Sequence, residues 1–172
     1  VGIDWRTAGI EHAREVRDLL GGDYYVDYAD NNSPDGKVVK LGDEIAYHTE
    51  TTVDWIGGFL QGKYSTDKYN LYGMGGISNI GYSFEDHFAA NTDSAGKAIN
   101  NYVEADAITT FQIKGGAVYN LDDRMSGFVN AGYVEKPPIL DNVIDNYGTV
   151  ATNPANEKYT SFEFGGKYAS GN

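Results

Sequence analysis

The sequence predicts an all-β protein, an antiparallel up-and-down meander of about six strands. Three observations predict it. Apolar and polar residues alternate with a period of two over several long runs. Glycine and tyrosine are abundant, at 22 and 14 of 172 residues. The connections between the runs alternate between short and long. The length suits one domain of ordinary size.

Composition excludes several classes of protein. The chain has 0 cysteines, which excludes a disulfide scaffold, thiolate metal sites and a cysteine nucleophile. Its net charge of -12 argues against a nucleic-acid partner, because no basic patch is present to neutralise phosphates. No apolar run is long enough for a transmembrane helix, but a membrane-spanning strand needs only about 9–11 residues.

The first elements expected are a strand stub and a helix. The stub covers Val1 to Arg6. Residues 9–22, GIEHAREVRDLLGG, place apolar residues near one helical face, and Gly21 and Gly22 would end the helix. We expect this short helix to decorate a loop, followed by an aromatic and turn-rich stretch.

Five longer strands are expected further along the chain. They cover residues 52–64, 69–84, 106–120, 125–135 and 158–169. Alternation is clean in the third run, where Phe111 and Ile113 oppose Gln112 and Lys114. It is only partial in the first two runs.

The connections have a regular rhythm. Tight breaks at 65–68 and 121–124 alternate with long polar stretches at 85–105 and 136–157. A further long loop is expected over 7–51. Short periplasmic turns and long outer loops are typical of outer-membrane β-barrels. Two prolines at 137–138 end one strand, and a short turn of helix is expected at 139–144.

Aromatic residues lie at both ends of the predicted strands. Those at the tight-turn ends are Tyr64, Tyr69, Tyr119 and Tyr168. Those towards the long loops are Trp5, Trp55, Tyr82, Phe84 and Tyr133. Two aromatic belts are typical of the two interfaces of a membrane barrel. The alternative is that tyrosine is simply a favoured strand residue.

Three segments resemble a known family. They are VGIDWRTAGIEHAREVRDLLGGDYYVDYAD, TVDWIGGFLQGKYS and KGGAVYNLDDRMSGFVNAGYVEKPPILDNVI, of which FVNAGY with PPILDNV is the most specific. They look like the barrel of TonB-dependent outer-membrane receptors, and more narrowly of the large receptors with a carboxypeptidase-like regulatory domain before the plug. The resemblance implies a barrel of 22 antiparallel strands around a plug, and TonB-driven uptake of a scarce nutrient.

The resemblance also implies what this chain is part of. No plug and no TonB box is recognised in the sequence, and neither is the terminal strand ending in an aromatic residue that such barrels use for assembly. Residues 1–172 are therefore expected to be a partial barrel, incomplete at both ends, in the cell outer membrane. Its expected partners are outer-membrane lipid, the plug and the remaining strands, with TonB bound only through the missing N-terminal part. The nutrient could be a siderophore, cobalamin, glycan or peptide.

Candidate site residues follow from the alternation and the loops. A polar lumen would be lined by Gln61, Lys63, Thr110, Gln112, Lys114, Asn130, Ser161, Glu163 and Lys167. The alternative is the wet face of a soluble sheet. Outer-loop aromatics that could stack on a ligand are Tyr24, Tyr25, Tyr28 and Tyr102.

Other candidate sites are weaker. The three histidines, His12, His48 and His87, have no metal-ligand spacing, so they are expected to be solvated and to hold no metal. Residues 30–36, DNNSPDG, fail as an EF-hand because Pro34 takes a ligand position, although calcium binding in acidic loops stays open. Residues 85–87 read as a hydrophilic loop base rather than a catalytic cluster. No nucleophile motif is present, so neither an enzyme nor a cofactor is expected.

Two alternative functions stay open. One is a soluble β-sandwich that binds glycans through its acidic loops. The other is a piece of a passive porin-type barrel. A soluble, cooperatively unfolding chain would favour the first, and a full reading frame without a plug domain and TonB box would favour the second.

Overall fold

The computed structural model describes residues 1–92, 95 and 98–170, and it confirms an all-β chain. Its strands are β1 (Gly2–Glu15), β2 (Tyr25–Asp27), β3 (Lys37–Val39), β4 (Glu44–Ser65), β5 (Tyr69–Thr92), β6 (Ala98–Asn120), β7 (Met125–Lys136) and β8 (Glu157–Tyr168). A single 3₁₀ turn, η1 (Leu140–Asn142), lies within the predicted turn at 139–144. Among the described residues, no helix has the length and apolar character needed to cross a membrane.

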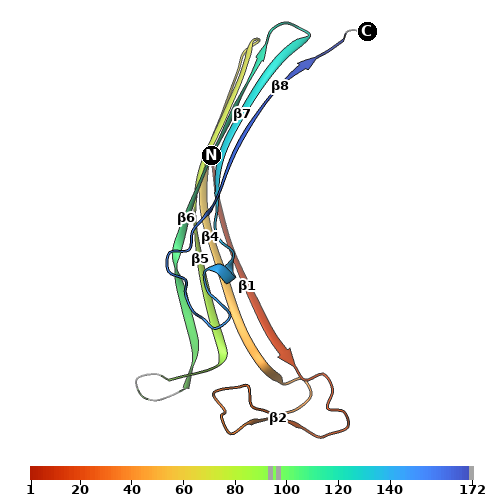
Figure 1. The fold of residues 1–172 in the computed structure, drawn as a ribbon, viewed down its shortest axis with the longest axis vertical. Coiled ribbons are helices and arrows are strands. Elements are labelled where there is room, and N and C mark those ends of the chain that lie inside the picture. The colour runs from red at the N-terminus through yellow and green to blue at the C-terminus, as the bar shows by residue number, and fades with distance from the viewer. Residues whose placement is uncertain (93–94, 96–97, 171–172) are drawn as a thin grey trace.

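The strands form one long sheet and one small hairpin. The sheet has six strands in the order β1-β4-β5-β6-β7-β8, and every neighbouring pair is antiparallel. Strands β2 and β3 pair only with each other, within the excursion 16–43 that connects β1 to β4. The predicted meander is therefore confirmed, with this excursion inserted. Figure 1 shows the sheet as a long curved band, with the tight turns at its upper end and the β2–β3 hairpin at its lower end.

The helix predicted over 9–22 is wrong. Strand β1 continues to Glu15 and pairs residue by residue with β4, so that Gly9 lies opposite Thr52. Of the apolar residues that suggested the helix, only Val16 is buried, at 6% exposure. The backbone ladder offered by β4 outweighs a weak helical pattern, because hydrogen bonds to a neighbouring strand satisfy the same backbone groups that a helix would.

The strands are longer than the alternation predicts. Strand β4 starts at Glu44, and the β5–β6 pair extends through most of the predicted loop 85–105. The predicted loop 7–51 shrinks to the excursion 16–43, and residues 93–94 and 96–97 lie outside the described part. Polar residues occupy both faces of these extensions, so the sequence shows no alternation there. Their backbones nevertheless pair with the neighbouring strand, like those of the central strands.

The tight turns are closed by local hydrogen bonds. The Thr66 N–H donates to the carbonyl oxygen of Tyr69 at 2.7 Å. In the other turn, the Oδ1 of Asp122 accepts the N–H groups of Arg124 and Met125 at 2.7 and 2.8 Å. By accepting these two backbone N–H groups, Asp122 forms an Asx-type turn, which stabilises the reversal of the chain between β6 and β7.

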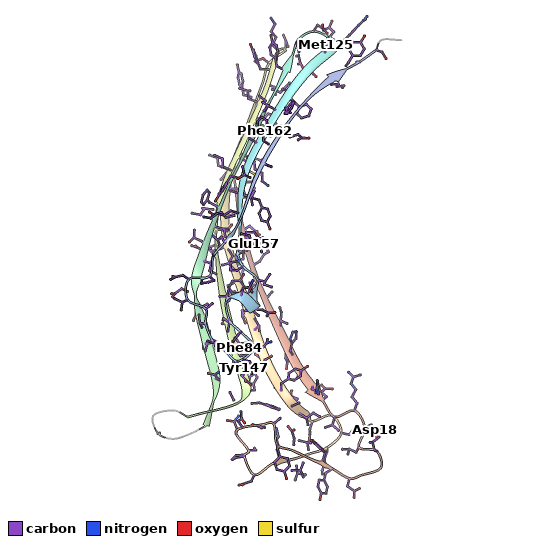
Figure 2. The ribbon with its side chains drawn as sticks, viewed as in Figure 1. Asp18, Phe84, Met125, Tyr147, Glu157 and Phe162 are labelled. Atoms are coloured by element: carbon purple, nitrogen blue, oxygen red, sulfur yellow. The ribbon has the colours of Figure 1, made fainter. Side chains whose placement is uncertain are left out.

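A small core lies at the long-connection end of the sheet. Its buried members are Ile80, Tyr82, Phe84, Ala105, Ile108, Val143 and Ile144. The last two belong to the connection 137–156, which we call the covering segment and which carries η1. The covering segment packs on one face of β4, β5 and β6. The excursion 16–43 contacts β5 near His87 and Phe88. Towards the tight turns, large apolar side chains such as Phe162 stay exposed (Figure 2).

Candidate functional site: the two faces of the sheet

The register assigns each residue to one of two faces, because residues directly opposite in an antiparallel pair share a face. Both faces are defined on five ranges of the sheet: 56–64, 69–77, 111–119, 125–133 and 160–168. The apolar face carries the first, third, fifth, seventh and ninth residue of each range. The polar face comprises the residues between them. Thus Ile113 shares the apolar face with its partners Gly75 and Tyr133, and Lys114 shares the polar face with its partners on β5 and β7.

The apolar face contains no Asp, Glu, Lys or Arg in any of these five ranges. Its large side chains are open to the surroundings: Leu60 is 68% exposed, Ile113 61% and Phe164 77%. Soluble monomers rarely expose contiguous apolar patches of more than a few hundred Å². No other described segment covers these three side chains, as their exposed fractions show.

The polar face collects the residues predicted to line a lumen. Those that the register brings together there are Gln61, Lys63, Thr110, Gln112, Lys114, Asn130, Ser161, Glu163 and Lys167. A chain of hydrogen bonds crosses this face. The Tyr72 hydroxyl donates to Asn130 Oδ1 at 2.5 Å, and the Asn130 amide donates to Glu163 Oε2 at 3.0 Å. The nine residues selected by alternation alone thus lie on one surface, with members on four of the five strands β4 to β8.

A groove lies where the polar face meets the covering segment. It encloses about 450 Å³ and is lined on the polar face by Trp55, Ser78, Thr110, Gln112, Lys136 and Tyr159. Thr110, one of the lining residues, is only 4% exposed. Trp55 and Tyr159 supply aromatic rings to the lining, and the other residues supply hydroxyl, amide and ammonium groups. Apolar lining with a few polar groups is typical of sites that bind small organic ligands.

The covering segment is held by polar contacts as well as apolar ones. The Tyr82 hydroxyl donates to the carbonyl oxygen of Pro138 at 2.8 Å, and burial raises the pKa of Tyr82. Further along, Asp145 Oδ1 accepts the N–H groups of Thr149 and Tyr147 at 2.8 and 2.9 Å. These two donors, Thr149 first, lower the pKa of Asp145 because they stabilise the ionised carboxylate.

The predicted aromatic residues share one face at the tight-turn end of the sheet, but those at the long-loop end divide between the two faces. Trp5 and Tyr133 lie on the apolar face, opposite Ile56 and Ile113. Near the tight turns, four exposed tyrosines share the apolar face: Tyr64, Tyr69, Tyr119 and Tyr168. At the far end, Trp55, Tyr82 and Phe84 point to the opposite face and pack in or against the core. They are not part of an outward belt, because the covering segment turns that end of the polar face into a core.

The predicted ligand-contacting tyrosines do not form one site. Tyr24, Tyr25 and Tyr28 lie in the excursion 16–43 and are at least half exposed, at 58%, 50% and 67%. Tyr102 lies within strand β6, opposite Glu85, so its placement in a loop is wrong. None of the four lines the groove beside Trp55.

Sequence reasoning missed one constellation. His48 and His87, treated separately as solvated, lie side by side on β4 and β5 with ring centroids 4.2 Å apart. The sequence contains two short patterns, His48-x-Glu50 on β4 and Glu85-x-His87 on β5. Because Glu50 is directly opposite Glu85 in the antiparallel pair, the two histidines also come to lie next to each other. Only the register between the two strands reveals it.

Comparison with protein-family models, with curated proteins and with solved structures gives no match.

Proposed function

We propose that this chain is a wall segment of an outer-membrane receptor barrel, which takes up a scarce nutrient with energy supplied through TonB. The apolar face contacts lipid and the polar face lines the passage. The observation that carries the proposal is the charge-free apolar face, aligned across five neighbouring strands.

The dimensions of that face suit a bilayer. Each of the five ranges, such as 56–64 or 111–119, spans nine residues. A strand that crosses the hydrocarbon core at a tilt needs about 9–11 residues. Charges appear directly beyond the ranges, at Asp54, Glu135 and Lys158. The tyrosines near the tight turns would then lie at one interface, where their amphipathic rings are favoured.

The rest of the sheet agrees with this role. Strands β1 and β8 are its edges, and unpaired edge groups in hydrocarbon cost several kcal/mol each. We therefore expect both edges to pair with further strands of a closed barrel. The covering segment lies on the polar face, so in a barrel it narrows the passage and places the groove beside Trp55 on the route of the ligand.

Site-directed cysteine labelling tests the proposal, because this chain has 0 cysteines of its own. Two neighbouring pairs compare the faces at equal depth: Ile113→Cys with Gln112→Cys, and Phe164→Cys with Glu163→Cys. In the intact protein in cell membranes, we expect the apolar-face members to resist a charged maleimide and react with a lipid-soluble one. The polar-face members should react with the charged reagent.

Equal labelling of both members of each pair by the charged maleimide would sink the proposal and favour the soluble sandwich. The receptor is distinguished from a passive porin by uptake. Transport that stops when TonB is deleted supports the receptor, and unchanged diffusion through the protein favours the porin.

A further inference from the structure

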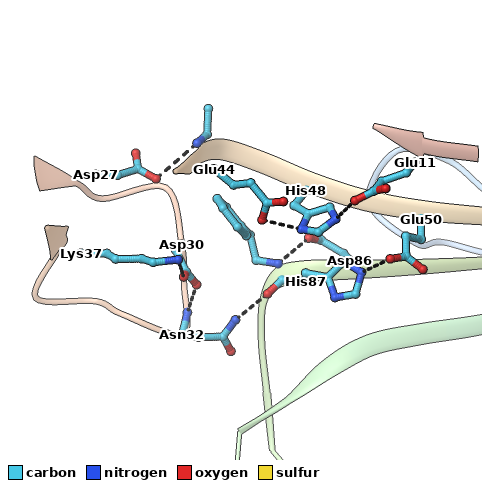
Figure 3. Close-up of polar contacts among 12 residues, drawn as sticks. Glu11, Asp27, Asp30, Asn32, Lys37, Glu44, His48, Glu50, Asp86 and His87 are labelled. Atoms are coloured by element: carbon cyan, nitrogen blue, oxygen red, sulfur yellow. Dashed lines mark hydrogen bonds and ion pairs between the residues drawn. The ribbon is translucent and has the colours of Figure 1, made fainter. Parts of the chain in front are cut away.

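The strongest unassigned feature is a cluster of two histidines and three glutamates at the long-connection end of the sheet. Its members are Glu11, Glu44, His48, Glu50 and His87, drawn in Figure 3. They come from β1, β4 and β5, and lie outside the charge-free ranges. We propose that this cluster binds a divalent transition-metal cation of the zinc class.

The geometry brings the ligand atoms together. One nitrogen from each of His48 and His87 and one oxygen from Glu50 all lie within 4.8 Å of one another, as do the atoms of His48, Glu11 and Glu44. In a tetrahedral zinc site with bonds of about 2.0–2.1 Å, ligand atoms lie about 3.3 Å apart. Small side-chain rotations close the remaining distance, since all five groups sit on side chains rather than backbone.

The contacts of His48 leave a place for a cation. Its Nε2 lies 2.9 Å from Glu11 and its Nδ1 lies 2.8 Å from Glu44. Carboxylates only accept hydrogen bonds, and a neutral imidazole has one N–H, so it can serve only one of them. Both carboxylates are satisfied either when the ring is protonated or when a metal ion takes the place of one proton. A metal ion bound at one nitrogen satisfies that nitrogen and its carboxylate, while the other N–H keeps its hydrogen bond and orients the ring.

The negative charge around the cluster also favours binding of a cation. Glu11 is directly opposite Glu50, and Glu50 is directly opposite Glu85, so three glutamates form a row across three adjacent strands. Like charges directly opposite each other destabilise a sheet. His48 and His87 contact Glu11 and Glu50 at 2.9 and 3.3 Å, and a divalent cation held between the two histidines would add positive charge beside the row.

The ligand types select the class of metal. Imidazole nitrogen suits zinc, copper, nickel and cobalt, whereas calcium and magnesium prefer all-oxygen sites. Two histidines with one glutamate is also a ligand set that zinc uses. The side chains of His48 and His87 are 14% and 22% exposed, so the ion can reach them while they remain held by their neighbours.

The bound cation would tie together segments distant in the sequence. Bound by His48, Glu50 and His87, it would join β4 to β5 close to where the excursion 16–43 docks. The contact of His48 with Glu11 links β1 to the same place. There the Asn32 amide donates to the carbonyl oxygen of His87 at 2.9 Å, and the Asn31 N–H donates to that of Phe88 at 2.9 Å. Metal binding should therefore order the excursion against β5.

The test uses Co²⁺ as a spectroscopic probe on the whole protein, purified in detergent and stripped with a chelator. We expect visible d–d bands of a tetrahedral site, displaced by Zn²⁺ and not by Ca²⁺. His48→Ala and His87→Ala should abolish the bands, and Glu50→Gln should weaken binding at least tenfold. His12→Ala is the matched control, because His12 is exposed on the opposite side of β1, and it should leave binding unchanged.

A second readout needs no variant. Carbethoxylation of histidines, mapped by mass spectrometry, should show Zn²⁺ protecting His48 and His87 but not His12. Absence of Co²⁺ bands in the wild-type protein, displacement by Ca²⁺, or equal reactivity with and without Zn²⁺ would each overturn the proposal. Neither readout depends on TonB or on a bilayer. A negative result for the metal site would therefore leave the proposed receptor role untouched, and the reverse also holds.

Discussion

The hydroxyl group of Tyr82 on β5 donates a buried hydrogen bond of 2.8 Å to the carbonyl oxygen of Pro138, 56 positions along the chain. Proline has no N–H, but its carbonyl still needs a donor when it is buried. This bond anchors the start of the covering segment to the sheet.

We predict that Tyr82→Phe loosens the covering segment. It removes the donor and leaves the Pro138 carbonyl unsatisfied, which costs about 1–3 kcal/mol. Limited proteolysis of the folded protein should cut within 137–156 faster in the variant. Tyr147→Phe is the control, because Tyr147 is 85% exposed in the same segment. Equal cleavage rates in the two variants would contradict the anchoring role.

We predict a pH dependence at the turn 145–149. The pKa of Asp145 is lowered in the fold by the N–H groups of Thr149 and Tyr147, so its stabilising effect is complete above the unfolded-state pKa of about 3.9. It is lost as the pH falls through the lowered pKa, because the protonated carboxyl accepts these bonds less well. Protease susceptibility of the covering segment should rise on acidification, and Asp145→Asn should remove part of that dependence.

A charge on the apolar face should disrupt assembly. Ile113→Lys places an ammonium group among exposed apolar side chains, which costs about 2–4 kcal/mol at a bilayer midplane. Gln112→Lys introduces the same group one residue away on the polar face, so it is the matched control. We expect less folded protein in the membrane fraction for Ile113→Lys only, measured by heat-modifiable mobility in gels.

Gly116 makes room for the hydrogen-bond chain across the polar face. A Cβ atom there would overlap Asn130 Oδ1 and lie 2.5 Å from the Tyr72 hydroxyl oxygen. Gly116→Ala should therefore displace the ends of these two flexible side chains, break the Tyr72–Asn130 bond and destabilise the protein by about 1 kcal/mol. Gly62→Ala, where nothing lies within 4 Å of the added atom, should be tolerated. Urea unfolding of both variants checks this, and equal midpoints would refute it.

The tight turn between β6 and β7 depends on Asp122. Asp122→Ala removes the acceptor for the N–H groups of Arg124 and Met125 and should destabilise the hairpin by about 1 kcal/mol. Asp123→Ala is the control, because no hydrogen bond of its side chain is found among the described residues. Faster hydrogen exchange at Arg124 and Met125 should appear in the first variant alone.

Much of the sheet could be predicted from the sequence. Period-two alternation located the central strands. A shift of a strand by one residue would move all its apolar side chains to the polar face, so the pattern also assigns each side chain to a face. The turn residues located the tight turns at 65–68 and 121–124. Together they placed Lys114, Asn130 and Glu163 on one face before the pairing was known, and the register agrees.

Other features needed the tertiary structure. The strand character of 9–15 comes from pairing with β4, which local periodicity does not report. The burial of Tyr82 and Phe84 comes from a segment more than 50 residues later in the sequence, so strand alternation could not distinguish them from an outward aromatic belt.

The sequence by itself determined the fold class, the tight turns and the separation of apolar from polar side chains, because these depend on neighbours within a few residues. Only the tertiary structure decided which residues meet across strands, because register is set by the pairing of whole strands. That pairing brings His48 to His87 and aligns Glu11, Glu50 and Glu85, and no spacing along the chain could have shown it.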